Sequence, residues 1–263
     1  MRGINPQVRF IDLTHDVSPQ NVLQGAFLLG TSWRYFPEGT VHLAVVDPGV
    51  GTERKALVVE GGGHYFVAPD NGLLSFVLPS YPPGEHDTLR QAHGTEQRPS
   101  LFSPYHAALP HGFRAYTLTS PRYWLPNVSN TFHGRDVFAP VAAHLSSGVP
   151  LEKMGEPVDT VTRLAIPSPH WEGARIVGCV LHIDHFGNIV TSVKAETLSG
   201  LKADIEVQVG GRSIRGLVKA YGQGSGLVAL IGSHGYLEVA LANGNAAQAI
   251  GVRVGDEVLL KRV

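Results

Sequence analysis

The sequence predicts an α/β domain followed by an all-β domain, because the pattern of apolar residues changes along the chain. In the N-terminal part, runs typical of buried strands alternate with helical stretches, which is the pattern of α/β folds. These strand-like runs are residues 8–13, 41–46 and 56–59. From about residue 175 onward, short strands separated by glycine turns predict a small β-barrel. The strands are residues 205–209, 213–220, 227–231 and 236–240.

The boundary between the two domains is expected in the segment 164–173. Pro167 and Pro169 make this segment a stiff linker. We therefore assign residues 1–165 to the α/β domain and residues 173–263 to the barrel.

Two helices are expected in the first domain. One covers residues 22–35, with Ser18 and Pro19 before it as N-terminal cap and first turn. The other covers residues 136–147.

A long surface insertion is expected at residues 81–112, which are rich in proline and show little periodicity. The histidines of this segment lack the close spacing of metal ligands, so we interpret them as part of a solvated loop and predict no metal site. They are His86, His93, His106 and His111.

Composition favours a soluble globular enzyme. The chain has 263 residues, 43% of them hydrophobic and 16% charged, so disorder is not expected. With a net charge of -1 and no basic stripe, binding to nucleic acid is not expected either. No apolar run approaches a membrane span, and the N-terminus lacks the apolar core of a signal peptide. The single cysteine, Cys179, lies in an apolar run and is interpreted as a buried structural thiol. Its isolation fits a reducing compartment, so we expect a cytoplasmic location.

The segment 44–54, AVVDPGVGTER, is the most informative part of the chain. An apolar strand-like run ends in Asp47, a Pro-Gly turn follows, and Arg54 comes seven residues after the acid. A carboxylate at the end of a buried strand, before a glycine-rich turn, is where α/β proteins often place chemistry. With His133 of the segment TFHGRD, these side chains could prepare a water molecule for attack. The alternative is a structural ion pair between Asp47 and Arg54 with His133 in the core. No GxSxG, HExxH or P-loop motif is present to decide.

Further candidates lie in three other segments. Asn71, in the run APDNGLL, could face a ligand or form a turn that caps the next helix. Asp184, Phe186 and Asn188, in HIDHFGN, combine an acid, a ring and an amide. That combination suits an organic cation or a purine, although Phe186 alone could also belong to the core.

The segment 232–236, GSHGY, is the last candidate. Its backbone N–H groups at a strand turn could hold a carboxylate, with Ser233 and Tyr236 nearby, or it could be a plain β-turn.

Taken together, six segments resemble one family, the S-adenosyl-L-methionine (SAM) hydroxide adenosyltransferases. These enzymes are also called SAM hydrolases and are related to the fluorinases and chlorinases. The segments occur in family order over nearly the whole chain, apart from the insertion at 81–112. They are IDLTHDVSPQNV, YFPEGTVHLAVVDPGVGTER, FVAPDNGLLS, NTFHGRDVFAPVAAHL, HIDHFGNIVT and GSHGYLEVALANGNAA.

The resemblance implies an N-terminal α/β/α sandwich, a C-terminal β-barrel and a homotrimer. It also implies that water attacks C5′ of SAM and releases adenosine and L-methionine, with SAM as substrate and no cofactor or metal. The catalytic set of the family falls on Asp47, Arg54 and His133. Its substrate contacts fall on Asn71, Phe132, Asp184, Phe186, Asn188, Ser233 and Tyr236.

Two rival functions and one departure from the family accompany this prediction. A halide-dependent adenosyltransferase is disfavoured, because the halogenating relatives carry a hydroxyl-bearing residue where this chain has Gly134, and because Asp47 would repel an anion. The second rival is a non-catalytic protein that binds adenosine or SAM.

Members of the family begin earlier, with a strand that ends in a Thr-Asp-Phe-Gly-like motif, whereas this chain begins MRGINP. We expect either a start set too far downstream or a shortened variant.

Overall fold

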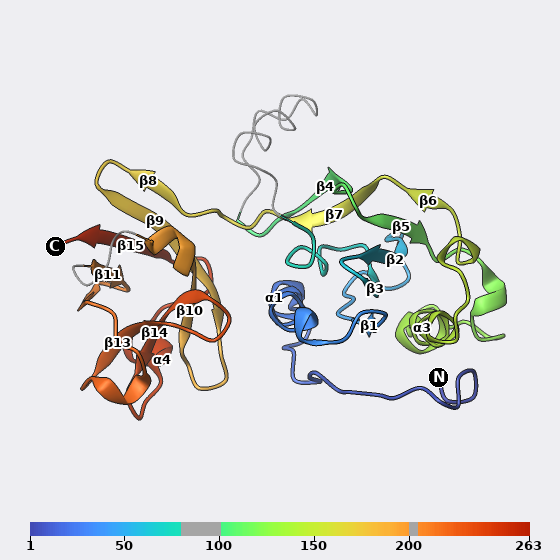
Figure 1. The fold of residues 1–263 in the computed structure, drawn as a ribbon, viewed down its shortest axis with the longest axis horizontal. Coiled ribbons are helices and arrows are strands. Elements are labelled where there is room, and N and C mark those ends of the chain that lie inside the picture. The colour runs from blue at the N-terminus through green and yellow to red at the C-terminus, as the bar shows by residue number, and fades with distance from the viewer. Residues whose placement is uncertain (80–100, 200–204) are drawn as a thin grey trace. The chain divides into compact units, whose positions relative to one another are not determined.

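The protein is described by a computed structural model that covers residues 1–79, 101–199 and 205–263. The chain forms two compact units, Met1–Ala165 and Ile166–Val263, and most of its regular structure is strand (Figure 1). In the described part of the chain, no helix is long and apolar enough to cross a membrane.

A five-stranded sheet forms the centre of the first unit, in the order β1-β3-β2-β5-β6. β1 runs parallel to β3, and the other neighbours are antiparallel. The strands are β1 (Val41–Leu43), β2 (Ala56–Gly61), β3 (His64–Pro69), β5 (Arg114–Thr117) and β6 (Pro157–Val158). A separate pair consists of β4 (Pro104–Ala108) and β7 (Thr160–Leu164).

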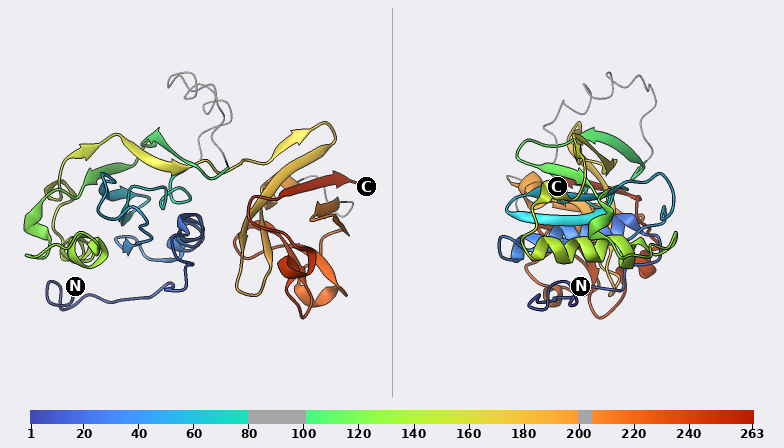
Figure 2. Two further views of the ribbon diagram at one scale, coloured as in Figure 1. Left: turned by 180° about the vertical axis from the view of Figure 1, so that it is seen from behind. Right: turned by 90° about the vertical axis from the view of Figure 1, so that its right-hand side faces the viewer.

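Helical segments cover both faces of this sheet. On one face, α1 (Val22–Ser32) continues into a 3-10 turn whose Trp33 ring meets Phe66 edge-on, with the centroids 5.5 Å apart. On the other face, α3 (Ala139–Ser146) packs against Val67. Successive residues of a strand point to opposite faces of the sheet, so the contacts made by Phe66 and Val67 place the two helices on opposite faces. Figures 1 and 2 show α1 and α3 on either side of the strands.

The second unit is a nearly closed, barrel-like sheet. Its order is β12-β11-β15-β9-β10-β14-β13, and the two end strands, β12 and β13, contact each other. Aliphatic side chains fill its interior, among them Val180, Ile189 and Val239. Its elements are β8 (His170–Glu172), β9 (Arg175–Ile183), β10 (Ile189–Lys194), β11 (Ile205–Val209), β12 (Arg212–Arg215), β13 (Leu227–Ile231), β14 (Tyr236–Leu241), α4 (Ala246–Ile250) and β15 (Glu257–Arg262).

Several expected elements are confirmed, and others are shorter or absent. The helix expected at 22–35 and the strands expected at 56–59, 205–209 and 227–231 are present. The strand expected at 41–46 ends at Leu43, and the one expected at 213–220 ends before Gly216, whose backbone is left-handed.

Two expectations near the N-terminus are wrong. Residues 8–13 form no strand, because they pair with no strand of the described chain, and Phe10, Ile11 and Leu13 are exposed. Ser18 and Pro19 do not cap α1. Asn21 does so, because its side chain accepts a hydrogen bond from the backbone N–H of Gln24.

Part of the expected insertion is regular structure. Residues 104–108 form β4 and pair with β7, so the prediction of a loop throughout 81–112 is wrong for them. The prediction rested on prolines, but Pro104 stands at the first position of the strand, where proline is tolerated. His106 and His111 are exposed, whereas His86 and His93 lie outside the described residues. Cys179 is buried, as expected, and burial raises the pKa of its thiol.

A buried histidine pair lies on the α1 face of the sheet. His42 Nε2 and His64 Nδ1 are 3.1 Å apart, so only one of the two nitrogens can carry the proton between them. Phe66 stacks on His42, while Phe36 and Trp33 meet the two imidazoles edge-on. Burial, followed by the charge of His64, lowers the pKa of His42 to about 4. Burial also lowers the pKa of His64, against the opposing charge of Glu38.

This pair predicts that the first unit loses stability in acid. A histidine whose pKa is lowered by folding stabilises the native state above its unfolded pKa of 6.5, and this contribution is lost as the pH falls toward 4. The melting temperature of wild type should therefore fall between pH 7 and pH 4.5, and His42→Phe should flatten that fall. His111→Phe, at an exposed histidine, is the matched control. Equal pH slopes for wild type and both variants would contradict the assignment.

Candidate active site

A tight turn after β1 brings Asp47 and Arg54 together. The N–H of Val50 donates to the carbonyl of Asp47, and the N–H of Thr52 donates to that of Gly49. Gly51 is left-handed at φ 79°. Arg54 Nη2 thereby donates to Asp47 Oδ2 at 2.6 Å, with the two side chains only 8% and 6% exposed. The ion pair of the structural alternative is thus present, and it is buried.

His133 joins this pair. Its Nδ1 lies 3.4 Å from Arg54 Nη2. A guanidinium has donors only, so Nδ1 accepts and the ring is neutral, with its proton on Nε2. His133 is only partly buried, whereas the alternative interpretation placed it in the core. The fully buried side chain nearby is Phe138, whose ring centroid lies 5.3 Å from the Arg54 guanidinium carbon.

Two buried polar atoms of this cluster have no hydrogen-bond partner among the described residues. They are Asp47 Oδ1 and Arg54 Nε. Leaving a buried acceptor and a buried donor unpaired costs free energy, and such groups are concentrated at sites that receive a ligand or water. The cluster therefore has one unused carboxylate oxygen beside a guanidinium and a neutral imidazole.

Asn71 fixes the backbone directly before Asp47. Its Nδ2 donates to the carbonyl of Val46 at 2.8 Å, and its Oδ1 accepts from the N–H of Leu73 at 3.2 Å. Both ends of the amide thus hold backbone. A pocket of about 580 Å³ opens beside Asn71 and Arg54. Its lining is completed by Glu53, Lys55, Asp70, Pro104, Tyr105, His106 and Thr162.

Phe132 lies in the loop that carries His133. Its ring is 55% exposed and lies 4.8 Å from the guanidinium carbon of Arg135. Arg135 also binds the buried carboxylate of Asp136, which accepts from the N–H of Ser129. These bonds lower the pKa of Asp136 far below its usual range. A π-helix over Gly134–Phe138 follows, a form that often occurs at functional sites.

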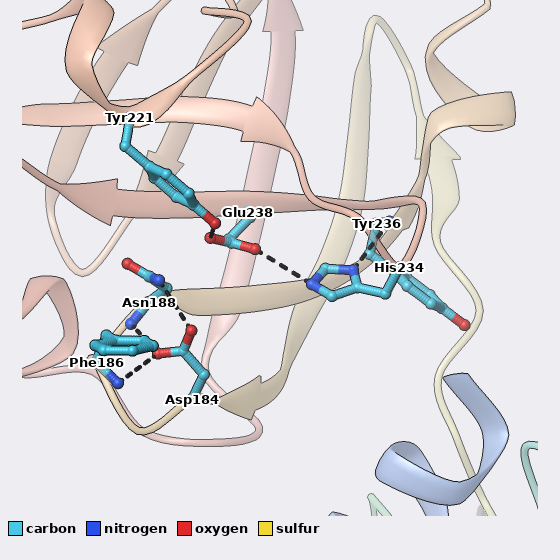
Figure 3. Close-up of polar contacts among 7 residues, drawn as sticks. All are labelled: Asp184, Phe186, Asn188, Tyr221, His234, Tyr236 and Glu238. Atoms are coloured by element: carbon cyan, nitrogen blue, oxygen red, sulfur yellow. Dashed lines mark hydrogen bonds and ion pairs between the residues drawn. The ribbon is translucent and has the colours of Figure 1, made fainter. Parts of the chain in front are cut away.

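The second unit holds the other candidate residues. Asp184 Oδ1 accepts from the N–H groups of Phe186 and Asn188, and its Oδ2 accepts from Asn188 Nδ2 at 2.9 Å (Figure 3). The loop between β9 and β10 is thus wrapped around one carboxylate. It leaves the ring of Phe186 73% exposed, so the core interpretation of Phe186 is wrong.

The turn at 232–236 connects β13 to β14. The N–H of Gly235 donates to the carbonyl of Gly232, and Ser233 is exposed. Lys194 Nζ lies 5.7 Å from the ring centroid of Tyr236.

Sequence reasoning missed a polar network next to this turn. Glu238 is buried on β14 and accepts from Tyr221 Oη at 2.7 Å, and His234 Nε2 lies 3.2 Å from its other oxygen (Figure 3). An acid within the otherwise apolar strand YLEVAL was the available signal. Burial, the hydrogen bond to Glu238 and the charges of Glu238 and Asp184 raise the pKa of Tyr221 to about 12.

His182 lies in the same electrostatic environment. Burial lowers its pKa, the charge of Asp184 opposes this, and His234 adds to it. Within residues 1–79, 101–199 and 205–263, no three His, Cys, Asp or Glu side chains are grouped as metal ligands would be.

Comparisons with known proteins agree on one family. Residues 1–104 and 100–155 match the SAM hydroxide adenosyltransferase N-terminal domain, and residues 178–259 match the C-terminal domain. A protein named (R)-S-adenosyl-L-methionine hydrolase from Thermus thermophilus is 38% identical over 97% of this chain and 89% of its own length. One of the same name from Salinispora tropica is 36% identical over 97% of this chain and 87% of its own.

More distant relatives and solved structures extend this likeness. A fluorinase from Nocardia brasiliensis is 25% identical over 99% of this chain and 89% of its own length. The crystal structure of an uncharacterized conserved protein from Thermotoga maritima superposes with a TM-score of 0.79 at 34% identity. That match covers 99% of this chain and 92% of the other.

The turn that pairs Asp47 with Arg54 predicts an unusual sensitivity at Gly51. A Cβ there would lie 2.6 Å from the carbonyl oxygen of Asn130, in the loop leading to His133. Gly51→Ala should destabilise by about 1–2 kcal/mol for the left-handed backbone and by about 1–3 kcal/mol more for the clash. Gly39→Ala is the matched control, because Gly39 is also left-handed, at φ 81°, but a Cβ there would meet nothing within 4 Å. Urea unfolding of both variants measures the difference, and equal losses would contradict the close approach of the two loops.

Proposed function

The chain belongs to the SAM hydroxide adenosyltransferase family, and on that premise we propose that it hydrolyses SAM to adenosine and L-methionine. Water attacks C5′ of SAM, the C5′–S bond breaks, and the sulfonium leaves as the neutral thioether of methionine. One proton is released from the attacking water. Asp47, Arg54 and His133 are the catalytic residues of this proposal.

The unpaired Oδ1 of Asp47 is the observation that carries the proposal. It is a buried carboxylate oxygen without a protein partner, while Arg54 occupies the other oxygen of the same group. A carboxylate in this state can accept a hydrogen bond from a water molecule and then take its proton.

The chemistry of the leaving group explains why no acid is required. A sulfonium becomes a neutral thioether when its bond to carbon breaks, so no proton has to be supplied to it. The difficult partner is the nucleophile, since bulk water has a pKa of about 15.7. Residues that polarise and orient one water molecule in line with the C5′–S bond therefore address the main barrier.

Arg54 and His133 complete this arrangement. Arg54 compensates the charge of the buried Asp47 carboxylate and accepts no proton, so it cannot compete as a base. The contact of Arg54 with Nδ1 leaves the His133 proton on Nε2, where it can donate to the oxygen of a bound water.

The second unit offers groups suited to the remaining parts of SAM. The exposed ring of Phe186 can stack on a purine, and Asp184 can meet the ammonium group of the methionine half. Asn188 gives its Nδ2 to Asp184, which leaves its amide oxygen to accept from a substrate donor. We include Asn71, Phe132, Ser233 and Tyr236 as substrate-binding residues.

We also propose that the protein forms a homotrimer, which sedimentation velocity can test, and that it is located in the cytoplasm.

The two alternative functions are less well supported. The relatives named hydrolases are 30–38% identical to this chain, whereas those named fluorinases are 25–29% identical. A halide beside Arg54 would also meet the Asp47 carboxylate, because Arg54 pairs with it at 2.6 Å, and that negative charge would repel it. A binding protein would hold SAM without cleaving it.

Isotope labelling tests the proposed reaction. Purified protein incubated with SAM in oxygen-18 water should release adenosine with the label in its 5′-hydroxyl, together with methionine. Mass spectrometry of both products measures this. Adenosine without label would exclude direct attack by water, and SAM bound at stoichiometric levels without turnover would favour the binding protein.

A further inference from the structure

The Tyr221–Glu238–His234 network has the arrangement of a positioning device. Glu238 presents one oxygen to Tyr221 Oη at 2.7 Å and the other to His234 Nε2 at 3.2 Å (Figure 3). Tyr221 comes from the segment between β12 and β13, and His234 comes from the turn between β13 and β14. One buried carboxylate thus connects two surface segments.

The partners of His234 define its protonation. The backbone N–H of Tyr236 donates to His234 Nδ1 at 3.3 Å, so this nitrogen accepts. The proton is then on Nε2, which donates to Glu238. The imidazole is held from both sides in one tautomer and one orientation.

The turn is built closely around this pair. A Cβ on Gly232 would lie 2.6 Å from Glu238 Oε2 and 2.8 Å from His234 Nε2, so a larger residue there would displace one of these side chains. The N–H of Gly232 donates to the carbonyl of Tyr236, and the N–H of Ala195 donates to that of Gly235. Gly232 thus lies directly against the Glu238–His234 pair, and backbone hydrogen bonds also hold the turn.

Glu238 does not belong to the interior of the barrel. It is opposite Val190, which is opposite His182, so the three share one face of the sheet. The neighbouring row, Ile183, Ile189 and Val239, points into the main core. The Glu238 face is nonetheless buried, and Val218 and Tyr221 belong to the segment that packs on it. Asp184 lies close enough for its charge to act on Tyr221.

We propose that Glu238 is a positioning residue for the amino-acid end of the substrate. Through His234 and Tyr221 it holds residues 232–236 in the shape in which the exposed Ser233 receives a carboxylate. This inference rests on the proposed function, since the carboxylate is that of the methionine half of SAM. Glu238 itself touches no substrate atom.

The variant Glu238→Gln tests the inference, because it keeps the size of the side chain. Its amide offers one acceptor oxygen in place of two, so the two donors can no longer both be accepted, and either the bond to His234 is lost or the Tyr221 hydroxyl must turn to accept from the amide. We expect KM for SAM to rise about 10-fold or more, with kcat within about 3-fold of wild type. Inhibition by L-methionine should weaken by a similar factor, while inhibition by adenosine stays within about 2-fold.

Glu206→Gln is the matched control. Glu206 is also a buried carboxylate of the second unit, bound by Gln208, Ser213 and Lys261 on β11, β12 and β15. Its KM should stay within about 2-fold of wild type. Tyr221→Phe removes the other hydrogen bond and should raise KM less, about 3-fold. If Glu238→Gln does not fold, as judged by circular dichroism, Tyr221→Phe tests the inference by the same criteria.

An unchanged KM in folded Glu238→Gln overturns the inference, and so does an equal rise in Glu206→Gln or an equal loss of adenosine inhibition. Wild type decides the proposed function separately, by its own turnover. If wild type binds SAM without hydrolysing it, calorimetric dissociation constants replace KM in the same comparison. Wild type that neither binds nor hydrolyses SAM overturns both proposals.

Discussion

A buried carboxylate bound on one side only is the constraint around which the first unit arranges its loops. The Asp47 side chain is only 6% exposed, and Arg54 binds only one of its two oxygens. Three segments converge on this pair: the turn after β1, the Asn71 amide that holds the carbonyl of Val46, and the loop of His133. A site built for stability alone would pair both oxygens, because an unpaired buried acceptor is costly. The unused oxygen is therefore best understood as a place kept for water.

In the second unit, two carboxylates also hold loops in place, and both oxygens of each have hydrogen-bond partners in the protein. Asp184 collects three donors from its own loop and leaves Phe186 in solvent, and Glu238 collects a tyrosine and a histidine beneath a neighbouring turn. Both loops are held by these hydrogen bonds, so the substrate-binding groups that we propose would need little rearrangement on binding. Such preorganisation reduces the entropy lost on binding.

Sequence reasoning succeeded where local pattern and structure coincide. The helix at 22–35 and the strands at 205–209 and 227–231 follow from apolar spacing, and the ion pair between Asp47 and Arg54, which the sequence offered as an alternative, is present. It failed where a partner distant in sequence decides. Residues 8–13 have the composition of a strand but no partner strand in the described chain. Pro104, in contrast, begins a strand because β4 pairs with β7. The role of Glu238 was missed for the same reason, since only the fold brings Tyr221, 17 residues earlier in the chain, to it.

The most direct test of this account is the rate of the chemical step in Asp47→Asn. Asparagine keeps the shape of the side chain but cannot take a proton from water. In single-turnover experiments with SAM bound, and with binding measured by calorimetry, the rate should fall by about 10²–10⁴-fold, while the dissociation constant stays within about 3-fold. Asp12→Asn, at an exposed acid, should match wild type. A rate for Asp47→Asn within about 3-fold of wild type, with SAM bound, would contradict the role of the unpaired oxygen.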